Sequence, residues 1–169
     1  MTDKIIKWSI GNFQFSITFL LLIAVIILTG PSCNKTSDNE YYHRFINHSW
    51  HRFNILQFEI PVEKTDQRFD VNFFIRHNRD YEFNTMDFNM VMTTPSGEER
   101  IREYQMNIRN KGGNFTGRFI GDSCEISIVL TNEMHFSKKG ILTIKIENLI
   151  PRIETNGLLG VGIRMKPVG

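Results

Sequence analysis

Apolar side chains recur at every second position in much of the chain after residue 41. Three runs show this clearly, with apolar positions at Leu56, Phe58, Ile60 and Val62, at Phe69, Val71, Phe73 and Ile75, and at Met86, Phe88, Met90 and Met92. A period of two is typical of a β-strand with one buried face. The sequence therefore predicts a strand at each run, and no convincing helical stripe occurs between them.

A turn follows the third run. In Thr94-Pro95-Ser96-Gly97, proline supplies a fixed φ and glycine a permissive one, as a tight turn requires. The segment from Glu99 to Ile108 is therefore expected to pair antiparallel with the strand before it.

Shorter alternating runs continue to the end of the chain, and they bring the expected total to about eight strands. They lie at 115–120, 124–130, 142–146 and 161–165. Each sheet built from such strands has one apolar face, and a second sheet is the available cover. Residues 41–169 are therefore predicted to form one all-β domain, an antiparallel two-sheet β-sandwich.

The first 32 residues have the layout of a signal peptide. Lys4 and Lys7 precede an apolar run over 13–28, which is shorter than the ~20 apolar residues of a membrane-spanning helix. Thr29-Gly30-Pro31-Ser32-Cys33 then resembles the lipobox of bacterial lipoproteins, which implies cleavage before Cys33 and acylation of its thiol. The alternative is an uncleaved anchor helix with an incidental cysteine.

Residues 33–40 are predicted to form the lipidated cysteine and a polar tether, because the segment is too poor in apolar side chains to order itself. Two or three acyl chains on Cys33 would hold the protein firmly at a bilayer. Asn34 is not the aspartate that resembles an inner-membrane retention signal, so the outer membrane is the expected location.

The charge balance limits the possible binding partners, and the cysteine count limits disulfide formation. The 20 basic and 18 acidic side chains nearly cancel, which excludes the strong positive field of a nucleic-acid-binding protein. Cys124 is the second cysteine and has no partner within the chain once Cys33 is acylated, so we interpret it as a buried apolar residue.

No segment of the sequence carries a recognisable catalytic or cofactor motif. The histidines His43, His48 and His51 lack the further ligands of a familiar zinc spacing, and we interpret them as solvated. Lys111-Gly112-Gly113 lacks the ending of a phosphate loop and is interpreted as a turn. The glycines Gly157, Gly160 and Gly162 are interpreted as sites of close sheet packing or bulges.

The acidic and aromatic residues allow two further hypotheses. Glu98, Glu99 and Glu125 are candidate acid and base groups of a glycosidase, but nothing in the sequence fixes their separation. A carbohydrate-binding lipoprotein is the alternative function, and its candidate stacking residues are Trp50, Tyr41, Tyr42, Tyr81 and Tyr104. The prediction is a protein with no enzyme activity, cofactor or metal.

The end of the second clear run is the candidate partner-binding site. Arg76, Arg79 and Tyr81 lie where that strand meets its loop, a position at which sandwich proteins often place recognition residues. A solvated, salt-bridged loop is the alternative interpretation for the two arginines.

A succession of short motifs is similar to the GldH family of gliding-motility lipoproteins. They are Trp50, Phe73-Phe74-Ile75-Arg76-His77 with Tyr81-Glu82-Phe83-Asn84, Thr94-Pro95-Ser96-Gly97, Gly113-Asn114-Phe115-Thr116-Gly117 and Gly160-Val161-Gly162-Ile163-Arg164. The resemblance implies a lipoprotein of the gliding machinery that works beside the type IX secretion apparatus. It also implies other gliding or secretion envelope proteins as partners and no enzyme activity.

Overall fold

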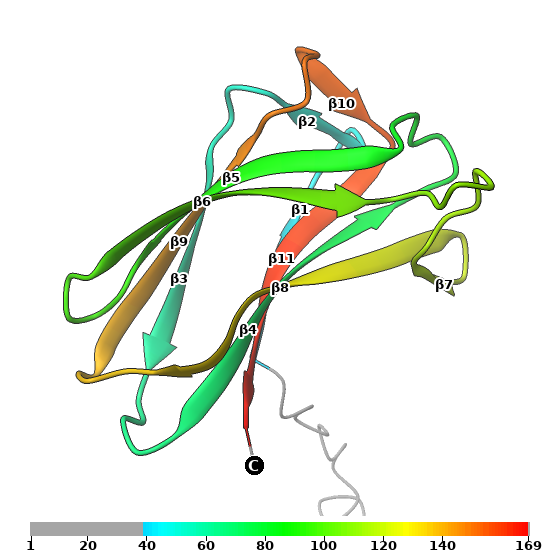
Figure 1. Cartoon of the computed structure of the whole chain (residues 1–169). Helices are drawn as coiled ribbons and strands as arrows, with labels where there is room; N and C mark the ends of the chain where they lie inside the picture. The colour runs from blue at the N-terminus through cyan, green and yellow to red at the C-terminus, as the bar shows by residue number, and fades with distance from the viewer. Residues whose placement is uncertain (1–38, 169) are drawn as a thin grey trace, which may run out of the picture. The chain divides into compact units, whose positions relative to one another are not determined.

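A computed structural model describes residues 39–168, and every regular element in that range is a β-strand (Figure 1). No helix of a length and apolarity suited to crossing a membrane occurs among these residues. The eleven strands are β1 (Asn39–Arg44), β2 (Ser49–His51), β3 (Leu56–Val62), β4 (Arg68–His77), β5 (Thr85–Thr93), β6 (Glu99–Asn107), β7 (Arg118–Ile120), β8 (Ser123–His135), β9 (Gly140–Asn148), β10 (Glu154–Asn156) and β11 (Leu158–Pro167).

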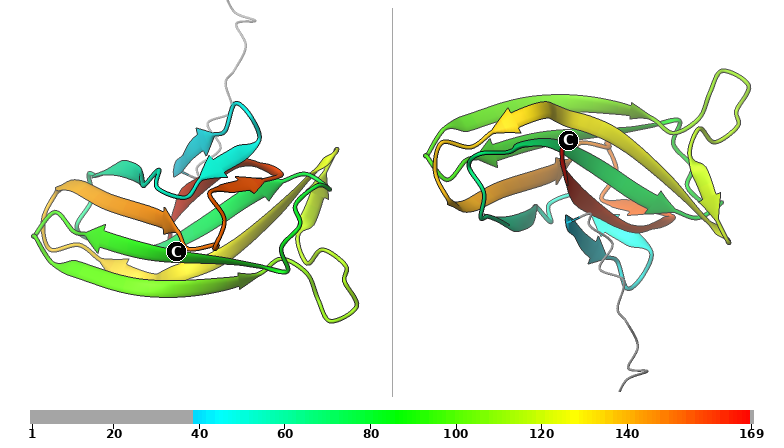
Figure 2. Two further views of the ribbon diagram at one scale, coloured as in Figure 1. Left: turned by 90° about the horizontal axis from the view of Figure 1, so that it is seen from above. Right: turned by 90° about the horizontal axis from the view of Figure 1, so that it is seen from below.

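The strands form three antiparallel sheets. A five-stranded sheet has the order β1-β11-β4-β8-β7, a four-stranded sheet has the order β3-β9-β5-β6, and β10 and β2 form a small third sheet. The two larger sheets lie as two layers in the views of Figure 2. The predicted all-β antiparallel class is confirmed, whereas the prediction of two sheets and about eight strands was wrong.

The clearly alternating runs of the sequence are the central strands. They become β3, β4 and β5, and their buried positions match the apolar ones. The predicted hairpin is also confirmed, since β5 pairs antiparallel with β6 over nine residue pairs. Its turn closes with the N–H of Gly97 donating to the carbonyl oxygen of Thr94 at 2.9 Å, and Gly97 has a φ of 89°.

The three strands that the sequence did not predict are β1, β2 and β10. Most side chains of β1 are polar, and β2 and β10 have three residues each, so none shows a usable alternation. Glu40, expected at the end of the polar tether, lies in β1 and pairs with Arg164 of β11.

Side chains from the two larger sheets share one hydrophobic core. The rings of Phe73 on β4 and Phe88 on β5 have centroids 4.4 Å apart. Tyr104 on β6 donates its hydroxyl to the carbonyl oxygen of Leu130 on β8 at 3.0 Å, which ties the two layers together near one side. Burial of apolar surface between the layers is the main source of stability for such an arrangement.

The strand directions give the body two distinct ends. The proximal end is where β1 begins and β11 finishes, because Asn39 lies opposite Met165. It carries the connections 63–67, 94–98 and 136–139. The distal end is the opposite one, and it carries the connections 45–55, 78–84, 108–117 and 149–157, including β2 and β10.

Candidate functional site

Arg76 belongs to an ionic cluster on the outer face of the five-stranded sheet. Its Nε lies 2.8 Å from Glu125 Oε2, and its Nη2 lies 2.9 Å from Glu40 Oε1. Arg164 on β11 reaches the same two carboxylates at 2.8 and 3.3 Å. Burial by itself would lower the pKa of Arg76, but the hydrogen bonds and charges of Glu125 and Glu40 outweigh it and raise that pKa. The two positive and two negative charges cancel within the cluster.

Aromatic rings lie beneath this ionic cluster. Tyr42 on β1 and Phe74 on β4 stack with centroids 5.8 Å apart and an interplanar angle of 6°. The guanidinium carbon of Arg76 lies 4.7 Å from the Tyr42 ring centroid, and that of Arg164 lies 4.5 Å from the Phe74 centroid. Phe74 points away from the main core and is nonetheless fully buried. The cluster therefore covers a second, smaller apolar core.

The glycines of β11 make space for those rings. A Cβ on Gly162 would lie 2.5 Å from Cζ of Phe74, and a Cβ on Gly160 would overlap the Tyr42 side chain. The sequence interpretation of close sheet packing is confirmed for these two residues. β11 also has a register shift between Leu158 and Gly160.

Arg79 and Tyr81 have other surroundings than Arg76. The guanidinium carbon of Arg79 lies 5.0 Å from the ring centroid of Phe119, and the side chain is exposed. Tyr81 is fully buried and donates its hydroxyl to the carbonyl oxygen of Thr85 at 3.1 Å. Burial, with a smaller effect of Asp87, raises the pKa of the Tyr81 hydroxyl. A partner role for these three residues stays a prediction, and the structure exposes Arg79 most directly.

His77, at the distal end of β4, is a buried histidine that the sequence analysis names only within a family motif. Its Nδ1 lies 2.8 Å from the carbonyl oxygen of Asn78, so Nδ1 carries the proton and donates. The ring packs beside Tyr81 and Phe115, at centroid distances of 5.4 and 4.7 Å. Its Nε2 has no hydrogen-bond partner among the described residues. Burial is the largest effect and lowers the pKa of His77, the hydrogen bond to Asn78 opposes it in part, and the charge of Arg109 lowers the pKa further.

This histidine predicts a pH dependence of stability. The unfolded chain binds a proton at His77 below its ordinary pKa of 6.5, whereas the folded chain binds it only at lower pH. Stability is therefore lost as pH falls below that value. The His77→Leu variant should show a smaller loss of unfolding free energy between about pH 7.5 and about pH 5, measured by urea unfolding. His135→Gln, at an exposed position, is the control, and equal losses in all three proteins would contradict the prediction.

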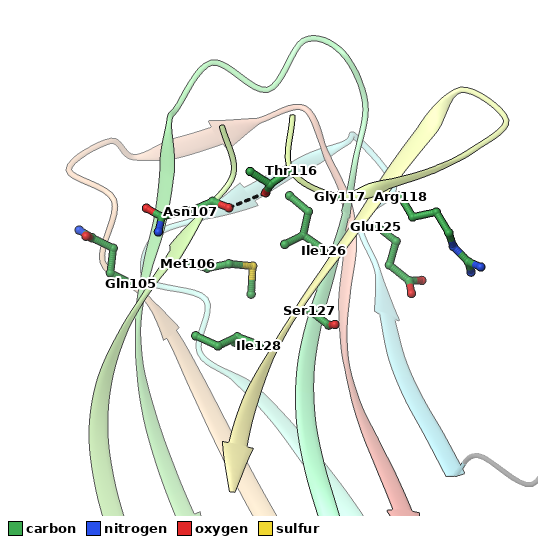
Figure 3. Close-up of a pocket in the computed structure, with 10 residues that line it drawn as sticks. All are labelled: Gln105, Met106, Asn107, Thr116, Gly117, Arg118, Glu125, Ile126, Ser127 and Ile128. Atoms are coloured by element: carbon green, nitrogen blue, oxygen red, sulfur yellow. Dashed lines mark hydrogen bonds between the residues drawn. The ribbon is translucent and has the colours of Figure 1, made fainter. Parts of the chain in front are cut away.

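A groove of about 540 Å³ opens at the side of the body between β6 and β8. Figure 3 shows its walls, which combine the apolar Met106, Ile126 and Ile128 with polar side chains around them. The hydroxyl of Thr116 donates to the carbonyl oxygen of Asn107 at 2.8 Å across one end. The titratable side chains in its lining are Glu125 and Arg118, and Glu125 is already held by Arg76 and Arg164.

The candidate acid and base residues do not meet. Glu98 lies in the turn before β6 at the proximal end and pairs with Arg100 at 2.8 Å. Glu125 lies near the distal start of β8. Glu99 begins β6 beside Glu98, so Glu125 lies at the opposite end of the body from both and does not form an acid–base pair with either.

The other residues that the sequence analysis considered are the three clustered histidines, the Lys111-Gly112-Gly113 segment and Cys124. Residues 39–168 contain no group of three or more side chains placed to hold a metal, His43, His48 and His51 included. The Lys111-Gly112-Gly113 segment is a turn, as interpreted, and Asn110 accepts the N–H of Gly112 at 2.9 Å. Cys124 is buried as interpreted, and burial raises its thiol pKa.

Trp50, the main candidate for sugar stacking, is part of the interior. It is fully buried, stacks on Phe45 with centroids 5.5 Å apart and donates Nε1 to the carbonyl oxygen of Asn54 at 2.8 Å. A sugar ring has no access to this side chain in the structure. Cys33 and the signal-peptide segment lie outside the described residues.

Comparison with models of protein families identifies the family of the chain. The family model described as GldH lipoprotein matches residues 39–165, which is nearly the whole described body. The chain belongs to the GldH lipoprotein family. Membership of a lipoprotein family implies a membrane-anchored position in the cell envelope.

Two curated relatives carry the GldH name. The chain is 26% identical over 152 residues to the gliding motility lipoprotein GldH of Flavobacterium johnsoniae, covering 87% of this chain and 94% of the relative. It is 21% identical over 155 residues to a GldH homolog of Christiangramia forsetii, covering 88% and 93%. No solved structure shows significant similarity to the chain.

Exposed apolar side chains at the distal end of this GldH-family body are the feature that sequence analysis missed. Ile46, Phe53, Ile55 and Ile153 are all more than half exposed, and all lie on connections around β2 and β10. The available signal was the presence of large apolar residues in otherwise polar connections, since such residues need not be buried. Their exposure, however, depends on which loop residues reach the core.

Proposed function

We propose that this chain is an accessory, non-enzymatic component of the gliding machinery, attached to the outer membrane through acylated Cys33 and working beside type IX secretion. The observation that carries the proposal is the family match over residues 39–165, which follows a signal-peptide layout ending at Cys33. Both relatives bear the name of a gliding motility lipoprotein or its homolog.

The geometry of the body supports a structural role. Three of its half-buried charged residues, Arg76, Glu125 and Arg164, are paired with one another and with Glu40 in the ionic cluster. The β6–β8 groove presents Glu125 only in that paired form. A general acid or base needs a titratable group free to exchange a proton with substrate, and a paired carboxylate does not supply one.

The tether sets where an anchored chain meets the body. β1 begins at Asn39, at the proximal end, and the polar segment from Cys33 to Asn39 extends at most about 20 Å. The proximal end therefore faces the lipid in the proposed arrangement, and the distal end is available to other envelope proteins.

The first test is disruption of the gene combined with replacement of Cys33. Cells lacking the chain should stop spreading and should secrete fewer type IX substrates into the medium. Cys33→Ala should abolish incorporation of labelled fatty acid and release the protein from the membrane fraction, because a single thiol carries the lipid. Cys124→Ala is the matched control and should remain labelled, since its thiol is buried.

The outcomes separate the parts of the proposal. Normal spreading and secretion after disruption would remove the gliding and secretion role. Labelling that survives Cys33→Ala would remove the lipid site and leave the uncleaved anchor helix as the explanation for membrane attachment.

A further inference from the structure

Large apolar side chains are exposed unevenly over the body. Of the nine that are exposed in the described residues, six lie at the distal end, and four of these surround the β2/β10 sheet. These four are here named the distal apolar patch, with exposed fractions of 93% for Ile46, 75% for Phe53, 55% for Ile55 and 66% for Ile153. The proximal connections 63–67, 94–98 and 136–139 expose no large apolar side chain.

The distal apolar patch stands on a rigid base. Trp50 of β2 and Thr155 of β10 lie opposite each other and are both fully buried. The turn before Ile55 is closed by the N–H of Asn54 donating to the carbonyl oxygen of His51 at 2.9 Å. The N–H of Arg52 donates to the carbonyl oxygen of Ile153 at 2.8 Å, which joins the two segments that carry Phe53 and Ile153. Exposed apolar groups on a fixed base lose little entropy on binding.

The net charge around the patch is positive. Residues 43–55 and 149–156 contain Arg44, Arg52 and Arg152 against one acid, Glu154, which accepts a hydrogen bond from Ser49. The proximal connections, by contrast, balance three basic residues with three acidic ones. A surface with an apolar centre and a cationic rim complements a partner with an acidic rim.

The position of the patch favours a protein as its binding partner, and not the bilayer that would hold the lipid anchor. The chain preceding Asn39 joins the body at the proximal end, and β4 alone spans about 30 Å from that end to the other. Figure 1 shows β2 and β10 at the top and the end of β11 at the bottom. With Cys33 acylated as proposed, the chain from the lipid enters the body at the end of the strands opposite the patch.

We propose that the distal apolar patch and its arginines form the docking surface for an envelope protein with an acidic rim around an apolar centre. This inference rests on the proposed function for the anchor and the envelope location. Phe53, the aromatic member of the patch, is the expected anchor residue, because aromatic and arginine side chains contribute most binding energy at such surfaces.

The test uses the full chain in its own cells and two independent patch variants. One is Phe53→Asp with Ile153→Asp, and the other is Arg52→Glu with Arg152→Glu. Ile101→Asp with Ile141→Asp is the matched control, because these side chains are also exposed but lie on the four-stranded sheet. A photo-crosslinking residue at position 53 in otherwise native chain reports contacts, and the same residue at position 141 is its control.

The expected result is a discrete protein adduct from position 53 and none from position 141. The adduct should fall about tenfold or more in the Arg52→Glu, Arg152→Glu background. Both patch variants should lose spreading while their amount in the membrane fraction stays normal, and the control variant should spread normally. The adduct and its charge dependence test docking even if disruption of the gene leaves spreading intact.

Other outcomes would overturn the inference. Adducts to lipid alone would assign the patch to a membrane, and adducts of twice the chain's mass would assign it to a second copy. Normal spreading by both patch variants, together with an adduct that ignores charge reversal, would show that the patch is not a docking surface.

Discussion

Trp50→Ala is expected to lower the unfolding free energy of the body by about 3–5 kcal/mol, the usual cost of truncating a buried tryptophan. The side chain is fully buried and packs on Phe45. Its loss also leaves the carbonyl oxygen of Asn54 without the indole N–H that reaches it at 2.8 Å. Since Trp50 is the buried residue of β2, the β2/β10 sheet should separate from the core in the variant.

Urea unfolding of residues 34–169, followed by circular dichroism, measures this effect. Trp50→Phe is the control, because it keeps an aromatic ring against Phe45 and removes mainly the hydrogen bond, at a cost of about 1–2 kcal/mol. Equal unfolding midpoints for the native protein and Trp50→Ala would mean that the β2/β10 sheet is not attached through this residue.

Gly162→Ala is expected to destabilise the body by about 3 kcal/mol, at the upper end of the cost of overpacking. The added Cβ would lie 2.5 Å from Cζ of Phe74 and 2.6 Å from the carbonyl oxygen of Tyr41. The ring could turn aside only by leaving the place where Arg76 and Arg164 cover it. The carbonyl oxygen belongs to the β1–β11 pairing and has no comparable freedom.

The same unfolding measurement tests this prediction, with Trp50 fluorescence as a second probe. Gly112→Ala is the control, because a Cβ there lies no closer than 3.3 Å to the side chain of Asn110 and should change stability by less than about 0.5 kcal/mol. Similar effects of the two substitutions on stability would show that close packing against Phe74 and Tyr41 does not require a glycine at position 162.

The central strands were predictable because each has one face on the core. β3 and β5 alternate buried and less buried residues along their whole length, so their apolar pattern alone defines them. The same reasoning fails for β1, whose residues are all at least partly exposed and which is held by pairing with β11. Edge strands of this kind are formed by tertiary context.

The candidate site was predicted less well, because contacts between distant segments decide which side chains remain accessible. Tyr81 is of a residue type that is common at recognition sites, yet it is buried beside His77. Arg76 was placed correctly near a strand end, but Glu40 and Glu125, which neutralise it, come from 36 and 49 residues away. The apolar residues of the distal connections gave no periodic pattern at all.

The position of β1 at the sheet edge has a mechanical consequence. A pull on the chain before Asn39, opposed by a load at the other end of the body, would slide β1 along β11. Six residue pairs join these strands, and sliding stretches their hydrogen bonds together instead of one at a time. Glu40, the second residue of β1, forms salt bridges with Arg76 and Arg164. These contacts add a cross-link at the end of β1 where the force is applied.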